Sequence, residues 1–307
     1  MALTLEEKKK LEEVLQRTGA HREAGAAVRE IPTEYKNYKN LVEQKEMLLY
    51  VLEAEVPVRC VVTTAKEKQE NCPVYVNMHG GGFIFLQDED DDLFCAYVAS
   101  QIQGIVVDID YASSRDYPYP MAFDQSYGVV HWVFEHCREW GANPAKISMG
   151  GHSAGGCLTA AIAMKAARTG DFKVCLQILD YAALDNYAPF EEGGAERSRA
   201  FSAYYVDGEL DKLRDPYVSP IFASADMMIG LPRTLIINAQ RCPFCIRNED
   251  YGKRLAAAGN EVVIKRFLNS RHGFSIRMLD EWKEAQELIV REIINATSKV
   301  DCMTNKN

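Results

Sequence analysis

The run Gly151-His152-Ser153-Ala154-Gly155 constrains the fold of this chain more than any other part of the sequence. It follows the segment 146–150 (KISMG), which is a plausible strand, and it leads into 154–168, which is helical by composition. Small residues around Ser153 let the backbone turn sharply from strand to helix. The hydroxyl then lies at a helix N-terminus, where the helix dipole stabilises developing negative charge. We therefore predict that Ser153 is a nucleophile; the alternative is a structural glycine-serine turn.

Strands and helices alternate from about residue 73 to the end of the chain. The predicted strands are 73–78, 104–111, 146–151, 174–181, 234–239 and 261–267, preceded by β-like residues within 47–64. This alternation is typical of an α/β fold with a mostly parallel central sheet and helices on both faces. We expect a single domain over residues 1–307. The segments 1–45 and 186–230 do not fit the alternation, and we expect them to form a small cap.

Charge and composition exclude several kinds of partner. The net charge of −9 argues against nucleic acid, because phosphate binding needs a basic face. No run of about 18 apolar residues is present, so no membrane insertion is expected. Nine cysteines, an odd number, and no apolar signal-peptide core favour a cytoplasmic protein with reduced thiols. The oligomeric state is left open, with a homodimer as one alternative.

Three consecutive glycines, Gly80 to Gly82, follow the predicted strand 73–78 and His79. Consecutive glycines cost backbone entropy, and close approach of backbone amides to a ligand is a reason to keep them. We predict that the amides of Gly81, Gly82 and Ala154 form an oxyanion hole. His79 is expected to support the loop through hydrogen bonds rather than act as a base. The alternative for the glycines is a flexible loop.

A His-Gly-Gly-Gly run begins at His79, and a Gly-His-Ser-Ala-Gly-Gly run begins 72 residues later at Gly151. The two runs together resemble the hormone-sensitive-lipase-like esterase family of α/β-hydrolases. The segments 215–220 (DPYVSP) and 271–274 (RHGF) resemble further family motifs, and the similarity spans about residues 55–295. Residues 112–116 depart from the family pattern, which we expect to alter loop packing only. The resemblance implies that His272 is the base that takes the proton from Ser153. It also implies a small-molecule ester substrate and no metal or organic cofactor.

The family's acidic residue is missing from its usual place, where this chain has Cys242. A neutral thiol cannot stabilise an imidazolium as a carboxylate does. We take Asp180, near the end of the preceding strand, as the orienting acid. Three alternatives remain open: a Ser–His dyad, an ionised Cys242, and loss of catalysis. Cys242 and Cys245 also form a C-x-x-C pattern, which indicates either two unpaired thiols or a regulatory redox pair.

These residues predict a serine carboxylesterase that hydrolyses small esters of short- to medium-chain acids, such as acetyl esters, through an acyl-enzyme. The limit on acyl length is implied by the family resemblance and its cap. One alternative is a ligand-binding or weakly active pseudo-hydrolase that has lost the usual acid. Another is an amidase or deacetylase that uses the same groups.

Overall fold

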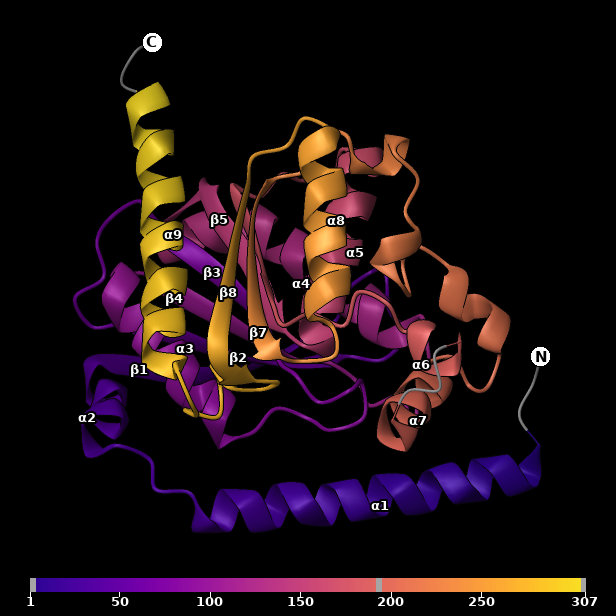
Figure 1. Ribbon diagram of the computed structural model, residues 1–307. Coiled ribbons are helices and arrows are strands. Elements are labelled where there is room, and N and C mark those ends of the chain that lie inside the picture. The colour runs from indigo at the N-terminus through magenta and orange to yellow at the C-terminus, as the bar shows by residue number, and fades with distance from the viewer. Residues whose placement is uncertain (1–3, 192–194, 305–307) are drawn as a thin grey trace.

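The computed structural model describes residues 4–191 and 195–304, and its centre is an eight-stranded sheet (Figure 1). The strand order is β1-β2-β4-β3-β5-β6-β7-β8. The strands are β1 (Val42–Leu49), β2 (Val58–Ala65), β3 (Cys72–Met78), β4 (Ile105–Asp110), β5 (Ala142–His152), β6 (Leu176–Asp180), β7 (Arg233–Arg241) and β8 (Val262–Arg271). β2 runs antiparallel to β1 and to β4, and all other neighbours are parallel. The predicted mostly parallel sheet is confirmed.

Helices cover both faces of the sheet, as predicted. The α-helices of the described residues, whether on the sheet or away from it, are α1 (Leu5–Val28), α2 (Thr33–Lys36), α3 (Glu89–Ile102), α4 (Met121–His136), α5 (Ala154–Thr169), α6 (Ala188–Glu191), α7 (Glu196–Tyr205), α8 (Cys245–Ala257) and α9 (Trp282–Thr304). Short 3-10 helices are η1 (Asn37–Leu41), η2 (Cys137–Trp140), η3 (Leu210–Arg214), η4 (Pro220–Phe222) and η5 (Asp226–Met228). None of the described helices has the length and apolar character needed to cross a bilayer.

Two apolar layers hold the helices on the sheet, because successive strand residues point to opposite faces. On β3, Val74 and Val76 pack with α4 and α5, whereas Tyr75 between them packs with α3 and α9. On β7 the same alternation sends Ile236 towards α8 and Leu235 towards α9. The sheet is therefore buried on both sides, and the ends of its strands are the surfaces left for a site.

Helix α1 lies along α7, apart from the sheet (Figure 1). Val14 and Leu15 of α1 are buried against Ile84 and Ala200. The Tyr204 hydroxyl donates a 2.7 Å hydrogen bond to Glu12. Both helices line the cavity that contains Ser153, so they cover the carboxyl end of β5.

Only part of each expected cap segment covers this cavity, namely α1 from 1–45 and α7 from 186–230. Within 1–45, helix α2 and η1 pack beside α3, where Tyr35 contacts the Tyr97 ring, and residues from Val42 onward belong to the sheet. Within 186–230, Met227 and Met228 pack against α5 and α8. The physical reason is the same in both segments. Their apolar side chains are buried against α3, or against α5 and α8, and not over the cavity.

Candidate active site

The predicted strand–turn–helix around Ser153 is present. Ser153 joins β5 to α5 with φ of 53° and ψ of −109°, a conformation that non-glycine residues rarely adopt. Its amide donates to the Asp180 carbonyl at 3.0 Å, and its carbonyl accepts from the Ala183 amide at 2.9 Å. A side chain at Gly155 would collide with the carbonyl oxygens of Met78 and His79. These contacts hold the serine in a strained turn at the N-terminus of α5.

The glycine loop after β3 lies directly beside this turn. A Cβ on Gly80 would stand 3.7 Å from Cβ of Ser153. Gly81 and Gly82 have φ of 139° and 65°, and the carbonyl of Gly81 accepts from the amides of Ile84 and Phe85 at 3.2 and 3.1 Å. In residues 4–191 and 195–304 the amides of Gly81 and Gly82 find no acceptor. These two donors are available to a ligand next to Ser153.

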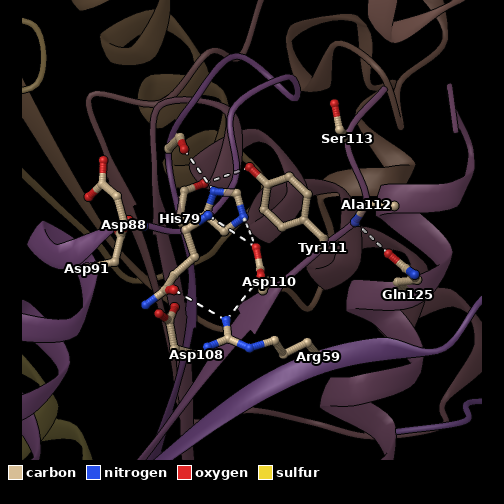
Figure 2. A network of polar contacts seen from close by, with 12 residues as sticks. Arg59, His79, Asp88, Asp91, Asp108, Asp110, Tyr111, Ala112, Ser113 and Gln125 are labelled. Atoms are coloured by element: carbon tan, nitrogen blue, oxygen red, sulfur yellow. Dashed lines mark hydrogen bonds and ion pairs between the residues drawn. The ribbon is translucent and has the colours of Figure 1, made fainter. Parts of the chain in front are cut away.

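His79, which precedes the glycine loop, belongs to a network of polar contacts with Tyr111 and Asp110 (Figure 2). Its ring stacks on Tyr111, with centroids 4.0 Å apart and planes 6° from parallel. Its Nδ1 lies 2.8 Å from the Gly80 carbonyl, and the Tyr111 hydroxyl donates to the His79 carbonyl at 2.7 Å. Asp110, which accepts from Arg59 at 3.1 Å, lies 3.7 Å from Nε2. Burial lowers the pKa of His79, so the ring is neutral and acts as a support for the glycine loop.

His272 lies just past β8 and lines the same cavity as Ser153 and the glycine loop. The cavity has a volume of about 640 Å³. The imidazole makes edge contacts with Tyr181 and Phe244, at centroid distances of 4.9 and 5.3 Å. These rings fix its orientation from two sides. The structure therefore brings the predicted nucleophile and the predicted base to one cavity.

The pKa of His272 is lowered to about 3. Burial is the first cause, and the guanidinium groups of Arg197 and Arg277 add to it. A neutral imidazole is able to accept a proton, but a pKa this low makes it a weak base.

Cys242 occupies the position that faces Nδ1 of His272, with Sγ 3.1 Å from that nitrogen. Burial raises the pKa of the Cys242 thiol to about 12, and Cys245 and Asp180 also raise it. The thiol is therefore neutral, which argues against the alternative of an ionised Cys242. Cys242 and Cys245 are both free and buried, and the Cys245 thiol faces Glu249 at 3.9 Å.

The structure corrects the predicted pairing of Asp180 with His272. Asp180 is fully buried, and its Oδ2 lies 2.8 Å from Nδ1 of His152 and accepts from the hydroxyl of Ser275. The cause is strand register: Asp180 ends β6 directly beside His152 of β5. The carboxylate thus pairs with the residue before the nucleophile, and the thiol of Cys242 faces the base instead.

Sequence reasoning missed several groups at the site. His152 stands within the serine motif, but the motif alone does not indicate its buried partner Asp180. Tyr181, which adopts φ of 35° after β6, contacts His272 although the two are far apart in sequence. Arg197 and Arg277 line the cavity from α7 and from the loop after β8. Only the folded chain brings these residues together.

Comparisons with known proteins agree with this fold. The α/β hydrolase fold family matches residues 75–276. Esterase LipI of Mycobacterium tuberculosis is 32% identical over 215 residues, which is 67% of this chain and 67% of that protein. Carboxylesterase NlhH of the same organism is 30% identical over 263 residues, or 82% of this chain and 81% of that one. An esterase structure from Pyrobaculum calidifontis has a TM-score of 0.76 at 27% identity and covers 85% of this chain and 88% of its own.

The chain therefore belongs to the α/β-hydrolase fold family. Within that fold it is a hormone-sensitive-lipase-like esterase, a serine ester hydrolase of the carboxylesterase type, as the sequence motifs predicted.

Proposed function

We propose that this protein hydrolyses small esters of short- to medium-chain acids, acetyl esters among them, through an acyl-enzyme on Ser153. One observation carries the proposal: Ser153, His272 and the glycine loop line a single cavity. Nucleophile, base and oxyanion donors are the three groups that acyl transfer requires. The His152–Asp180 pair lies next to the serine turn, because His152 precedes Ser153 and the carbonyl of Asp180 accepts a hydrogen bond from the Ser153 amide.

The reaction follows from the roles of these groups. His272 takes the proton from the Ser153 hydroxyl as Oγ attacks the ester carbonyl carbon. The carbonyl oxygen becomes an oxyanion, which the amides of Gly81, Gly82 and Ala154 bind. The tetrahedral species collapses, and the alcohol leaves with the proton from His272. Water then attacks the acyl-enzyme by the same route, releasing the acid and restoring Ser153.

A second, smaller cavity supports the short end of the acyl range. It has a volume of about 30 Å³, and Ser153 and Gly82 line it together with Phe201 and Phe244. Ser153 thus lies between a small cavity and the large one. We assign the acyl group to the small cavity and the alcohol part of the ester to the large one. An acetyl group suits the small cavity better than a long chain does.

The neutral Cys242 thiol supports turnover by a Ser–His dyad. Without a carboxylate the imidazolium formed in the transition state has no negative partner, so the reaction is slower than in a complete triad. The same observation favours a second candidate function, a ligand-binding protein with little or no hydrolysis.

A fluorophosphonate probe separates these two functions. The expected result is an adduct on Ser153, found by peptide mass spectrometry and absent in the Ser153→Ala variant. Folded protein without this adduct would contradict the hydrolase proposal and favour the binding protein.

Hydrolysis of 4-nitrophenyl acetate, butyrate and octanoate tests acyl length, and kcat/KM should fall along the series. 4-Nitroacetanilide is the amide counterpart of the acetate, and failure to cleave it would show that the protein hydrolyses esters and not amides.

A further inference from the structure

The large cavity is lined by several charged side chains, and its carboxylates are all paired. Asp88 pairs with Arg22 at 2.9 Å, and Glu196 pairs with Arg17 at 3.5 Å. Asp90, almost buried, forms a two-pronged contact with Arg29. None of these carboxylates is left to balance another cation in the cavity.

Arg197 and Arg277 line the same cavity without such a partner. In the described part of the chain neither guanidinium makes a salt bridge or donates a hydrogen bond. The Arg277 side chain packs against Gly273. A Cβ added to Gly273 would stand 3.5 Å from Cδ of Arg277 and 3.7 Å from Nε of Arg277. Gly273 adjoins the base His272. Both arginines lie close enough to His272 to lower its pKa.

Two unpaired cations at a partly enclosed site favour an anionic ligand. Guanidinium groups bind carboxylates through charge-assisted hydrogen bonds, which are stronger than neutral ones. The two arginines line the large cavity and are absent from the lining of the small one. They therefore lie on the side that we assigned to the alcohol part of the ester.

We propose that the alcohol part of the natural substrate carries a carboxylate, and that Arg197 and Arg277 bind it. This inference rests on the proposed esterase function and names the substrate class of the same site. It also gives the substrate a second effect. A bound carboxylate offsets the two positive charges beside His272 and so makes the imidazole a better base. The substrate then supplies part of the negative charge that Cys242 does not.

A matched pair of aryl acetates tests the proposal. In 4-acetoxybenzoate the alcohol part carries a carboxylate, and in 4-acetoxybenzamide a neutral amide of similar shape takes its place. We expect kcat/KM for the benzoate to exceed that for the benzamide by about tenfold or more, after correction for spontaneous hydrolysis, since hydrogen bonds to charged groups have this magnitude. Added salt should reduce the preference because Arg197 is exposed.

Variants of the arginines locate the effect. Arg197→Gln and Arg277→Gln should each lower the benzoate-to-benzamide ratio of kcat/KM by about tenfold, because each removes a hydrogen-bond donor to the carboxylate. Arg199→Gln is the matched control, because Arg199 lies on the same helix but outside the cavity lining. Its ratio should equal that of the wild type. A preference that persists in the Arg197→Gln/Arg277→Gln double variant would overturn the proposal.

Two further outcomes keep the two proposals apart. Equal rates on both acetates, with Ser153 labelled by the fluorophosphonate, would reject the carboxylate site and leave the esterase function intact. No hydrolysis of either acetate and no label would reject the esterase function itself. The mono-4-nitrophenyl ester of adipic acid carries its carboxylate on the acyl side. A gain with this ester over 4-nitrophenyl hexanoate, instead of with the benzoate, would overturn the assignment to the alcohol side.

Discussion

The Sγ atom of Cys242 lies 3.1 Å from Nδ1 of His272, on the side of the imidazole opposite to the one that must receive the serine proton. Catalysis requires the tautomer with hydrogen on Nδ1, so that Nε2 is free to accept. A carboxylate selects this tautomer because it only accepts hydrogen bonds. A neutral thiol donates as well as accepts, and so it does not select the tautomer. The aromatic contacts of His272 fix the plane of the ring but not its proton.

Replacing Cys242 by aspartate should raise kcat/KM for 4-nitrophenyl acetate by roughly 10²-fold. The carboxylate would face Nδ1, select the productive tautomer and stabilise the imidazolium of the transition state. Initial rates with active sites counted by fluorophosphonate titration measure the change. Cys242→Asn is the matched control: it has the same shape without the charge and should bring no comparable gain. An equal increase in both variants would show that charge is not what the site lacks.

The pH dependence of kcat/KM should report the lowered pKa of His272. The base acts in its neutral form, so activity is lost as pH falls through its pKa. Among the described residues, the titratable and charged groups near the ring are Cys242, Tyr181, Arg197 and Arg277, and none of these four is negative at neutral pH. With a pKa of about 3, the wild type should keep its activity down to about pH 4 to 5.

The Cys242→Asp variant should behave differently across the same range. Its carboxylate stabilises the imidazolium and raises the pKa of His272 towards the ordinary value of about 6.5. Activity should then fall by about tenfold between about pH 7.5 and 5.5. Rates measured with a neutral acetate in both proteins test this. Acid limbs at the same pH in wild type and variant would argue against His272 as the base.

Much of this fold was predictable because apolar segments of strand length alternate with helical ones from residue 73 onward. The turn at Ser153 was predictable too, since glycines and other small residues are required where chain segments approach each other closely, as Gly155 approaches Met78. The partner of Asp180 was not predictable. It depends on strand register, which places Asp180 beside His152, and no local pattern encodes that pairing.

The sequence also did not show which charged side chains line the cavity or which of them are paired. Arg197 and Arg277 are 80 positions apart, counting from 197 to 277, and each looks like an ordinary surface arginine there. Which arginines are paired depends on packing: Glu196 reaches Arg17 of the distant helix α1 rather than its neighbour Arg197. The identity of a cationic site therefore emerges only when every carboxylate has been assigned to its partner.

Replacing Asp180 by asparagine should lower the free energy of unfolding substantially and kcat/KM of the folded protein only slightly. The carboxylate is fully buried between His152 and Ser275, and removing its charge weakens both hydrogen bonds. Breaking one side of such a buried pair costs about 3 kcal/mol. Urea unfolding should show this loss, and Ser275→Ala should cost less because His152 keeps its acceptor. If Asp180→Asn leaves stability unchanged but abolishes the turnover of folded protein, Asp180 has a direct role in catalysis after all.

Alanine at Gly82 should abolish most activity, and a second substitution should restore part of it. A Cβ on Gly82 would stand 2.5 Å from ring atoms of Phe201, and so the glycine loop must move and its amides leave the oxyanion. Losing one such donor costs about 10² to 10³ in kcat. The obstacle is a side chain, so Gly82→Ala/Phe201→Ala should recover activity relative to Gly82→Ala alone, although φ of 65° remains a cost for alanine.

Gly81 provides the comparison for this rescue. A Cβ there would collide with the backbone carbonyl of Phe85, and its φ of 139° is one that alanine rarely adopts. No side-chain truncation removes a carbonyl, and so Gly81→Ala/Phe85→Ala should remain as inactive as Gly81→Ala. Rates on 4-nitrophenyl acetate for the four variants decide the matter. In this explanation a side chain blocks a Cβ at Gly82, whereas a backbone carbonyl blocks one at Gly81. Recovery of activity in both double variants, or in neither, would contradict it.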